Sequence, residues 1–240
     1  MRGLFVTATD TGVGKTILSA CLLSAMAADG ERVRAFKPVV TGLEDRAQRG
    51  GGEADRWPAD HELLAAAAGM SPRDVAPFRY GPATSPHLAA ELAGEPIAPD
   101  RLLTAARGAS DPDAQRETLV VEGVGGLLVP LAPDYLVRDL AAISRGSSSA
   151  AARAGLGTIN HTLLTIDAAR AAGLEVLAVV LTPWPAQPTT LERSNRETIA
   201  RLGDVEVQTL AVVAGPEETE LAQAGGALPW RRWLTDARSR

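Results

Sequence analysis

The sequence predicts an α/β fold in a single domain, residues 1–240, with a mainly parallel sheet covered by helices on both faces. Two observations support this class. Apolar segments of strand length alternate with segments of helical character along most of the chain, which is the order that parallel sheets require. One segment, TLVVE at residues 118–122, has a continuous apolar centre, as is typical of strands buried on both faces.

The strands and helices are punctuated by glycine and proline. Gly30 ends the first helix, and Pro86 and Pro99 each begin one. Pro38 has no N–H to donate to a sheet, so it is expected at the end or edge of its strand. The expected strands are residues 3–7, 33–40, 118–122, 176–181 and 205–213. The expected helices are residues 14–28, 60–68, 86–93, 99–108, 158–172 and 191–202, with a short one in the tail.

Composition limits the class of protein. The chain has 240 residues, of which 45% are hydrophobic, and a net charge of -5, so a general basic surface for nucleic acid is not expected. The single cysteine, Cys21, lies among apolar residues and is expected to be buried, as suits a reducing compartment. No apolar run is long enough to span a bilayer, and the sequence predicts a cytoplasmic protein. Residues 42–59 are expected to form a surface loop, and Trp230 and Trp233 to be packing anchors.

Lysine is rare in this chain. Of 24 basic residues only two, Lys15 and Lys37, are lysine, and the others are arginine. Lysine carries a compact charge on a flexible stem, whereas arginine is a planar fork, so a site that needs one does not accept the other. Lys15 belongs to a Gly-Lys-Thr string and Lys37 to AFKPVVTG. Both positions are therefore predicted to be chemical requirements, against the alternative of compositional accident.

A phosphate loop is expected where the first strand meets the first helix. The string TATDTGVGKT stands at this junction, and backbone N–H groups of residues 12–16 would cradle phosphates at the positive end of the helix. Lys15 would reach the outer phosphates, and the Thr16 hydroxyl would bind Mg²⁺. The strict pattern needs glycine where Thr9 stands, so only its second half is intact. The context favours a P-loop NTPase-like fold with a nucleotide site at Gly12, Val13, Gly14, Lys15, Thr16 and Ile17.

Two acidic residues are candidates for a metal site beside this loop, because Mg²⁺ on a phosphate-loop threonine also takes one or two carboxylates. Glu122 ends a predicted strand, at the edge of the sheet where α/β proteins bind ligands. The glycine at Gly125 would then let the backbone approach a ligand closely. Asp60 is the second candidate, although the residues alone favour a simple N-cap at this position. His61, next to it, is expected to be solvated.

Taken together, these motifs resemble the dethiobiotin synthetase family. The resemblance covers nearly the whole chain, and its carriers are VTATDTGVGKT, FKPVVTG, the Asp60 helix, ATSPHLAAE, VEGVGG and GLGTINHTLLT. Family loops have glycine where this chain has Ala8, which explains why the strict loop pattern fails. The resemblance implies an enzyme that uses ATP and Mg²⁺ to close a ureido ring from 7,8-diaminononanoate and CO₂. One amine becomes a carbamate, ATP phosphorylates it, and the second amine displaces phosphate.

The resemblance also implies roles for individual residues. It assigns catalysis to Lys15, Lys37 and Thr11, substrate contacts to Thr41, Thr158, Ile159 and Asn160, nucleotide contacts to Glu122, Gly125, Thr182 and Gly215, and metal ligation to Thr16, Asp60 and Glu122. The substrate carboxylate is expected at the start of the helix at 158–172, across the interface of a homodimer. The family often has asparagine where Thr182 stands, which leaves recognition of the base open.

The chain departs from the family just before GLGTINH. The family has an apolar central strand there, whereas this chain has ISRGSSSAAARAG, and serine is poor material for a buried parallel strand. Two compensating frameshifts, which would turn valine codons GTC into serine codons TCG, are one hypothesis for the change. If the serines are genuine, a weakened centre and a disordered segment at residues 143–153 are expected. A relative inactivated by the altered strand at 144–152 stays an alternative.

Two other functional classes compete with the synthetase. Nucleotide-switch ATPases of the partitioning and division-site type share the fold and the loop. They carry an extra lysine early in the loop, where this chain has only Thr9, Asp10 and Thr11. Amidotransferase-type synthetases that act on corrinoids are longer and need a glutaminase cysteine, which a buried Cys21 cannot supply.

Overall fold

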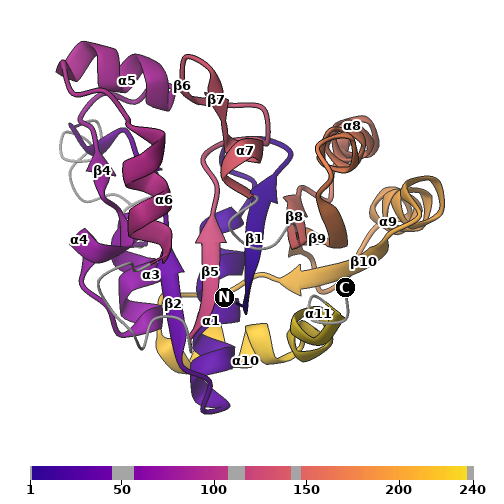
Figure 1. The fold of residues 1–240 in the computed structure, drawn as a ribbon. Coiled ribbons are helices and arrows are strands. Elements are labelled where there is room, and N and C mark those ends of the chain that lie inside the picture. The colour runs from indigo at the N-terminus through magenta and orange to yellow at the C-terminus, as the bar shows by residue number, and fades with distance from the viewer. Residues whose placement is uncertain (1, 45–56, 108–116, 142–146, 237–240) are drawn as a thin grey trace.

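The computed structural model describes residues 2–44, 57–107, 117–141 and 147–236. Its centre is a six-stranded sheet in which every pair of neighbouring strands runs parallel (Figure 1). The predicted α/β class with a mainly parallel sheet is therefore confirmed. In spatial order the strands are β10 (Glu206–Ala211), β9 (Glu175–Trp184), β8 (Ser147–Ala152), β1 (Arg2–Ala8), β5 (Thr118–Glu122) and β2 (Val33–Phe36).

One face of the sheet is covered by the helix that follows the phosphate loop and by its neighbours. These helices are α1 (Lys15–Ala28), α3 (Asp60–Ala68), α10 (Glu218–Gly226) and α11 (Trp230–Asp236). Their apolar side chains form one core with Leu4 and Val6 of β1 and Val120 of β5. Trp230 and Trp233 are each 1% exposed in this core, which confirms them as packing anchors.

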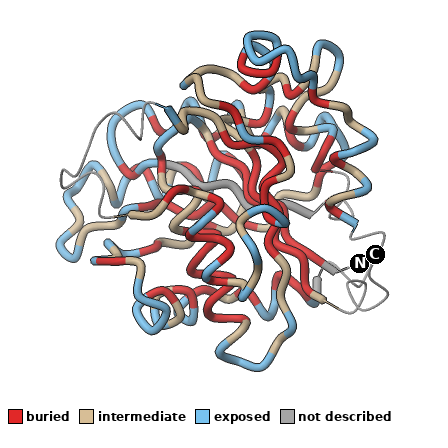
Figure 2. The backbone as a smooth tube through the Cα atoms, turned by 90° about the vertical axis from the view of Figure 1, so that its left-hand side faces the viewer, coloured by how far each residue is buried: buried red, intermediate tan, exposed pale blue. Residues whose placement is uncertain are grey.

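The opposite face carries a second set of helices. They are α5 (Pro86–Ala93), α6 (Pro99–Arg107), α7 (Val137–Ala141), α8 (Thr158–Ala171) and α9 (Thr190–Gly203). Phe5, Leu119 and Val121 belong to the core on this side, so buried residues of β1 and β5 alternate between the two faces, as side chains of a strand do. Figure 2 shows the buried residues running through the middle of the molecule, between the two helical layers.

The expected strand at residues 33–40 is in fact two strands. After β2 the chain leaves the main sheet, and β3 (Val39–Val40) pairs with β4 (Phe78–Arg79). The break falls at Lys37, whose N–H donates to the carbonyl oxygen of Val75 at 2.9 Å, and at Pro38, which has no N–H to offer a ladder. Besides β4, three short elements that the sequence did not predict complete the fold. They are α4 (Pro72–Val75) and the antiparallel pair of β6 (Pro130–Ala132) and β7 (Tyr135–Leu136).

The serine-rich segment forms β8, between β1 and β9 in the sheet. Its backbone pairs on both sides, with Ser148 opposite Phe5 and Val176. The expectation of a disordered segment is therefore wrong for residues 147–152, while residues 143–146 lie outside the described residues. The physical reason is that a serine offers the ladder the same N–H and C=O groups as a valine. The pairing with β9 is nevertheless irregular, because the register shifts between Ser148 and Ser149.

Three remaining expectations concern exposure. Cys21 is fully buried in α1, and burial raises the pKa of its thiol to about 12, as expected for an unreactive cysteine. Of the expected surface loop at 42–59, the structure describes only residues 42–44 and 57–59. Among the helices of the described ranges, none combines the length and apolar character needed to cross a bilayer.

Candidate active site

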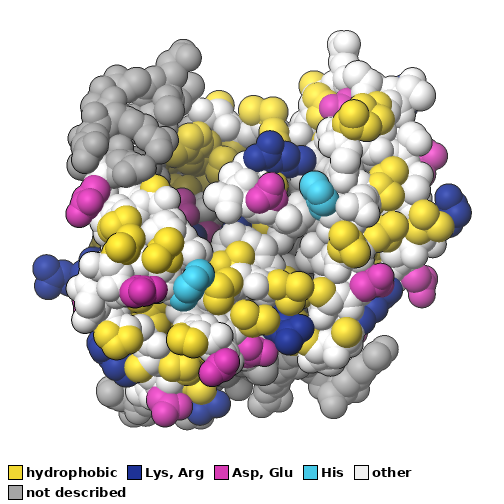
Figure 3. Space-filling view, turned by 90° about the horizontal axis from the view of Figure 1, so that it is seen from above, with side chains coloured by type: hydrophobic (Ala, Val, Ile, Leu, Met, Phe, Trp, Pro, Cys, Tyr) yellow, Lys and Arg dark blue, Asp and Glu magenta, His cyan; other side chains and the backbone are white. Residues whose placement is uncertain are grey.

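The candidate site lies at the carboxyl edge of the central strands, where β1, β5 and β2 end side by side. β5 ends at Glu122, and β2 ends one residue before Lys37. The register sets Val6 beside Glu122 and Phe36 beside Val121, which brings Glu122 and Lys37 to the same level of the sheet. Figure 3 looks down on this edge, where the surface is hollowed. Ligand sites of open parallel sheets commonly lie at this edge.

The phosphate loop enters α1 through two glycines with a left-handed backbone. Gly12 has φ 70°, and Gly14, the N-cap of α1, has φ 102°, values that favour glycine. Ala8, where the family has glycine, is the last residue of β1 and pairs with Ala151. Among the described non-glycine residues only Asp204 has a positive φ. Ala8 therefore costs the loop no backbone strain.

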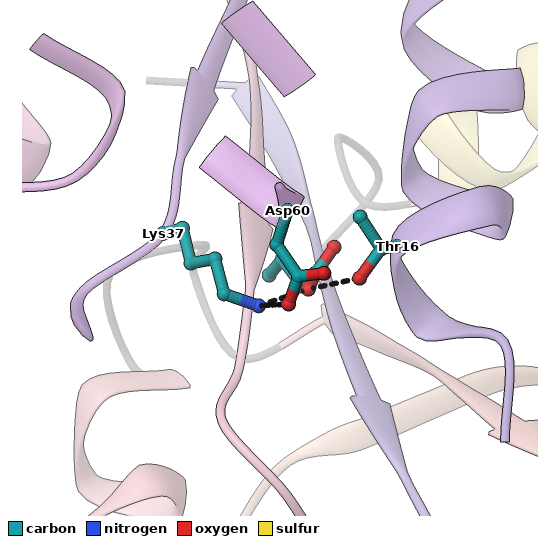
Figure 4. A network of polar contacts seen from close by, with 4 residues as sticks. Thr16, Lys37 and Asp60 are labelled. Carbon is teal, nitrogen blue, oxygen red and sulfur yellow. Dashed lines mark hydrogen bonds and ion pairs between the residues drawn. The ribbon is translucent and has the colours of Figure 1, made fainter. Parts of the chain in front are cut away.

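Lys37, Asp60, Glu122 and Thr16 form one network of polar contacts (Figure 4). Nζ of Lys37 lies 2.7 Å from Oδ2 of Asp60 and also pairs with Oε1 of Glu122. The hydroxyl of Thr16 donates to the same Oε1 at 2.9 Å. Glu122 is fully buried and Lys37 is 4% exposed, so water screens this ion pair only weakly.

Asp60 reaches the network from the first residue of α3. The N-cap of this helix is Ala59, whose N–H donates to Oε2 of Glu62 at 3.0 Å. The expectation that Asp60 itself is the cap is therefore wrong. Because Glu62 reaches back to satisfy the start of the helix, the carboxylate of Asp60 can turn toward Lys37 instead.

The charged groups of the site shift one another's pKa. Burial alone would lower the pKa of Lys37, but the carboxylates of Glu122 and Asp60 outweigh it and raise this pKa above its ordinary value. Burial would likewise raise the pKa of Asp60, and the ammonium of Lys37 outweighs it and lowers that pKa. The pKa of Lys15 is lowered, chiefly by burial, with Glu122 opposing the shift and Lys37 adding to it. The Lys37–Asp60 pair is therefore ionised at neutral pH.

The oxygen donors of this network fit Mg²⁺. A threonine hydroxyl and two carboxylates, from Thr16, Asp60 and Glu122, are hard ligands of the kind that Mg²⁺ takes beside phosphate oxygens. Oε2 of Glu122 is buried and has no hydrogen-bond partner among the described residues. A buried carboxylate oxygen without a partner is costly, and a cation would satisfy it. The residues expected to hold the metal thus lie together and leave one oxygen available for it.

Comparison with known proteins assigns the chain to a family. Residues 2–223 match a family described as an AAA domain. The chain is 38% identical over 216 residues to the ATP-dependent dethiobiotin synthetase BioD of Anaeromyxobacter sp. (strain Fw109-5), covering 85% of this chain and 91% of that protein. It is 39% identical over 202 residues to the ATP-dependent dethiobiotin synthetase BioD of Brucella ovis, covering 83% and 84%. The chain belongs to the dethiobiotin synthetase family.

A solved structure outside this synthetase family shares the architecture. The MinC:MinD cell division protein complex of Aquifex aeolicus matches with a TM-score of 0.50 and 12% identity, over 99% of this chain and 93% of that one. At this identity the likeness concerns the fold alone. It agrees with the P-loop NTPase-like fold predicted from the sequence.

Two of the further residues that the synthetase family implies, Thr11 and Thr182, lie in or against the phosphate loop, and a third does not. A Cβ placed on Gly125 would lie 3.5 Å from Oγ1 of Thr11, so these two residues are neighbours. Thr182, in β9, packs against the loop, because its Cγ2 would lie 3.0 Å from a Cβ on Gly14. With 3% exposure it is a supporting residue of the loop in this structure. Gly215 lies beyond β10, the edge strand farthest from β2.

The residues expected to bind diaminononanoate fall on two other elements. Thr41 follows β3, one residue before Gly42, whose φ is 82°. Thr158, Ile159 and Asn160 form the first turn of α8, directly after β8 and its loop. Thr158 is 5% exposed and Ile159 packs against the core, whereas Asn160 is exposed. The structure therefore joins Lys37, Asp60 and Glu122 in one site, while the residues expected to bind diaminononanoate lie on other elements.

Two residues that the sequence analysis did not single out hold loops of the synthetase site. Nη2 of Arg153 donates to the carbonyl oxygens of residues 11 and 12, at 3.3 and 3.4 Å. Nδ2 of Asn195, buried in α9, donates to the carbonyl oxygens of residues 154 and 155, at 2.9 and 3.0 Å. Neither belongs to a local motif, because the partners of Arg153 are 142 and 141 positions away and those of Asn195 are 41 and 40.

The expectation that His61 is solvated is wrong. It is 6% exposed, and burial lowers its pKa. The reason lies in the helix: Asp60 occupies the side of α3 that faces the site, and the next residue is turned by about 100° around the axis. In α3 that turn leads into the interior, where Nδ1 of His61 has no partner among the described residues.

Proposed function

We propose that this chain is an ATP-dependent dethiobiotin synthetase, which forms dethiobiotin from 7,8-diaminononanoate, CO₂ and ATP and releases ADP and phosphate. One observation carries the proposal. The only two lysines of the chain, Lys15 and Lys37, are buried and lie in one cluster with Asp60 and Glu122 beside the phosphate loop. Relatives that are 38% and 39% identical over most of their length are named for this activity.

Nucleotide binding is the first task of the proposed site. The N–H groups of residues 12–16 and the ammonium of Lys15 would hold the phosphates at the start of α1. Thr16, Asp60 and Glu122 would hold Mg²⁺, which supplies neutralisation of the phosphate charge. Thr182 would line the nucleotide site beside the loop, and Gly215 would contribute to its base wall.

Ring closure places several anions in one small space. An oxygen of the substrate carbamate attacks the γ-phosphorus, and the bond to ADP breaks. The second amine then attacks the carbonyl carbon of the mixed anhydride, a C–N bond forms, and phosphate leaves as the amine loses its proton. Lys15 and Lys37 would stabilise the negative charge that develops on these oxygens, and preorganised groups of this kind often contribute most of the rate enhancement. Thr11 and Thr41 would orient the carbamate and the amine.

The remaining parts of the proposal concern partners. Thr158, Ile159 and Asn160 would bind the substrate carboxylate at the start of α8, where a helix N-terminus favours an anion. They would do so across the interface of a homodimer. The proposal includes a cytoplasmic location and no nucleic-acid or membrane partner.

The deciding experiment measures ADP release by the purified chain with diaminononanoate and bicarbonate present together or singly. A synthetase releases ADP only when both are present, and mass spectrometry then detects dethiobiotin. ATP hydrolysis that needs neither compound would indicate a nucleotide-switch ATPase instead. A folded chain that binds ATP but makes no dethiobiotin would indicate an inactivated relative.

Lys37→Arg tests whether the site needs the shape of lysine. Arginine keeps the positive charge but replaces a compact ammonium with a fork. We expect turnover to fall by about a hundredfold or more, a factor comparable to the loss of one stabilising donor in other active sites. ATP affinity, measured without Mg²⁺ with a fluorescent analogue, should change by less than about threefold, because Lys15 remains. Near-normal turnover would show that charge alone is sufficient.

A further inference from the structure

Lys37 contacts one oxygen of each carboxylate that would hold the metal, and only Oε2 of Glu122 is left without a partner among the described residues. Its ammonium lies 2.7 Å from Oδ2 of Asp60 and pairs with Oε1 of Glu122, the oxygen that also accepts a hydrogen bond from Thr16. The side chains of Lys37 and Glu122 are 5% and 1% exposed, so water offers little compensation to a group that loses its partner. A metal ion and the ammonium of Lys37 cannot both bind Oδ2 of Asp60 and Oε1 of Glu122 at the same time.

Charge balance decides what can replace the ammonium. The cluster holds two lysines, Lys15 and Lys37, and two carboxylates, Asp60 and Glu122, and the ammonium of Lys37 pairs with both carboxylates. A divalent metal alone would add positive charge that nothing in the cluster compensates, which is costly in a shielded site. A metal that arrives with a triphosphate brings more negative than positive charge. Its phosphates also offer new partners to the ammonium.

We propose that Lys37 makes metal binding conditional on the nucleotide. Its ammonium competes with the metal for Asp60 and Glu122, so the metal binds only together with a nucleoside triphosphate, whose phosphate oxygens receive the ammonium. The inference rests on the proposed function, because it takes Thr16, Asp60 and Glu122 as the metal ligands. It adds a role in metal selection to the proposed role of Lys37 at the carbamate.

The surroundings of Lys37 suit such an exchange of partners. Its backbone is held in place, since its N–H donates to the carbonyl oxygen of Val75 at 2.9 Å and Pro38 follows it. Only the flexible stem has to move, which lysine allows. An arginine at this position would bind a carboxylate through two parallel hydrogen bonds and would release it less readily. The competition therefore also accounts for lysine in a chain that otherwise uses arginine.

The test measures metal binding in the absence of nucleotide. Mn²⁺ is the probe, because it takes the same kind of oxygen ligands as Mg²⁺ and its free concentration is read by electron paramagnetic resonance. We expect Lys37→Met to bind Mn²⁺ about tenfold more tightly than the wild type, or tighter still, since the buried carboxylate of Glu122 and the half-exposed one of Asp60 then lose this ammonium. Lys15→Met is the matched control, because it removes the same charge from the same site without freeing these oxygens. It should tighten binding by less than about threefold.

Two outcomes would overturn the proposal. One is a wild type that binds Mn²⁺ without nucleotide as tightly as Lys37→Met does. The other is equal tightening by Lys15→Met, since net charge alone would then govern the site. If Lys37→Met folds poorly without metal, the rise of its melting temperature with Mn²⁺ replaces the titration. That rise should begin at a lower Mn²⁺ concentration than in the wild type, and an equal onset would overturn the proposal.

Dethiobiotin formation by the wild type, measured on the same preparation, separates this inference from the proposed function. A wild type that makes dethiobiotin but binds Mn²⁺ tightly without nucleotide loses only the inference. A wild type that makes none loses the proposed function, and with it the assignment of the metal ligands on which the inference rests.

Discussion

Glu122 joins the phosphate loop to the rest of the site at the scale of single residues. Its Oε1 accepts a hydrogen bond from Thr16 of the loop and pairs with Lys37, beyond the end of β2. Its own strand lies directly beside β1, which leads into the loop. Because the side chain is fully buried, both contacts are made where the surroundings screen charge weakly. A single carboxylate thus connects the phosphate loop to Lys37.

The variant Asn195→Ala tests whether Asn195 holds the loop that precedes α8. Its amide donates to the carbonyl oxygens of residues 154 and 155, and Asn195→Ala removes both hydrogen bonds. A hydrogen bond of this kind contributes about 0.5–1.5 kcal/mol, so we expect KM for diaminononanoate to rise about tenfold. KM for ATP should stay within about twofold, because the contacts of the phosphate loop to Glu122 are untouched.

The exposed neighbour Ser194 provides the control for this prediction. Ser194→Ala lies on the same helix and should leave both KM values unchanged. A parallel rise of KM for ATP and for diaminononanoate in Asn195→Ala would mean that the variant disturbs the whole sheet edge. In that case Asn195 does not act specifically on the loop that precedes α8.

Which residues can be predicted from sequence depends on what marks them. Lys15 stands in a loop motif, and Glu122 stands at the end of an apolar strand, so both could be placed in the site before the fold was known. The contact between Lys37 and Asp60 could not, because the local sequence places Asp60 at the start of α3 but does not tell which way its carboxylate points. The role of Asn195 could not be predicted either, because its hydrogen-bond partners lie 40 and 41 positions away in the sequence.

At the scale of elements, the close packing of α1 and α10 depends on one glycine. A Cβ on Gly225 would lie 1.9 Å from the carbonyl oxygen of Cys21 and 2.9 Å from Cβ of Ala25. The first atom belongs to the backbone of α1 and cannot swing aside, so a larger residue must push the helices apart. Gly226, the next residue of α10, would place its Cβ in open space. The two adjacent glycines are therefore a matched pair.

We expect Gly225→Ala and Gly226→Ala to have effects of opposite sign. Overpacking of a dense core costs about 1–3 kcal/mol, so Gly225→Ala should lower the free energy of unfolding by about that amount. Gly226→Ala meets no neighbour and should raise it by up to about 1 kcal/mol, because alanine favours helix. Urea denaturation of both variants measures the difference. Equal effects would show that α10 does not rest on α1 at Gly225.

Most elements could be predicted, and the exceptions have identifiable causes. Helix α5 and strand β5 were predicted to the residue, because proline begins one and continuous apolar residues form the other. The strand expected at 33–40 is too long. The chain leaves the sheet at Lys37, where the N–H donates to the carbonyl oxygen of Val75, a residue far away in the sequence. Strand β8 was expected to be disordered, because propensity does not include the pairing that two neighbouring strands supply.

At the scale of the whole molecule, the two cores meet the site from opposite faces of one sheet. Leu4 and Val6 of β1 belong to the core around α1, and Phe5 belongs to the core around α6 and α7. The site begins where β1 ends, so its geometry depends on both cores being closed. The order of strands and helices and the continuous apolar centre of residues 118–122 made a sheet covered on both faces predictable from the sequence, whereas the strand order of the sheet was not.

Cys21 offers a measure of closure for the whole molecule. It is the single cysteine of the chain and is fully buried in α1. Burial raises the pKa of its thiol from 9.0 to about 12, and the thiolate is the form that reacts. A thiol reagent should therefore modify Cys21 only when the core around α1 opens. At pH 8 we expect native labelling to be about a thousandfold slower than in denaturant, or slower still, as the stability of a small domain implies.

Mg²⁺ with ATP should slow this labelling further, because a ligand that binds only the folded chain stabilises it.

The pH dependence of the free energy of unfolding has a definite sign. The unfolded thiol ionises near 9.0 and the folded one near 12, so the free energy of unfolding should fall as pH rises between these values. Other groups titrate in the same range, and Cys21→Ala isolates the contribution of the thiol: the wild type should lose more stability than this variant across that interval. Fast native labelling that ATP does not slow would show that the core around α1 opens without unfolding of the molecule.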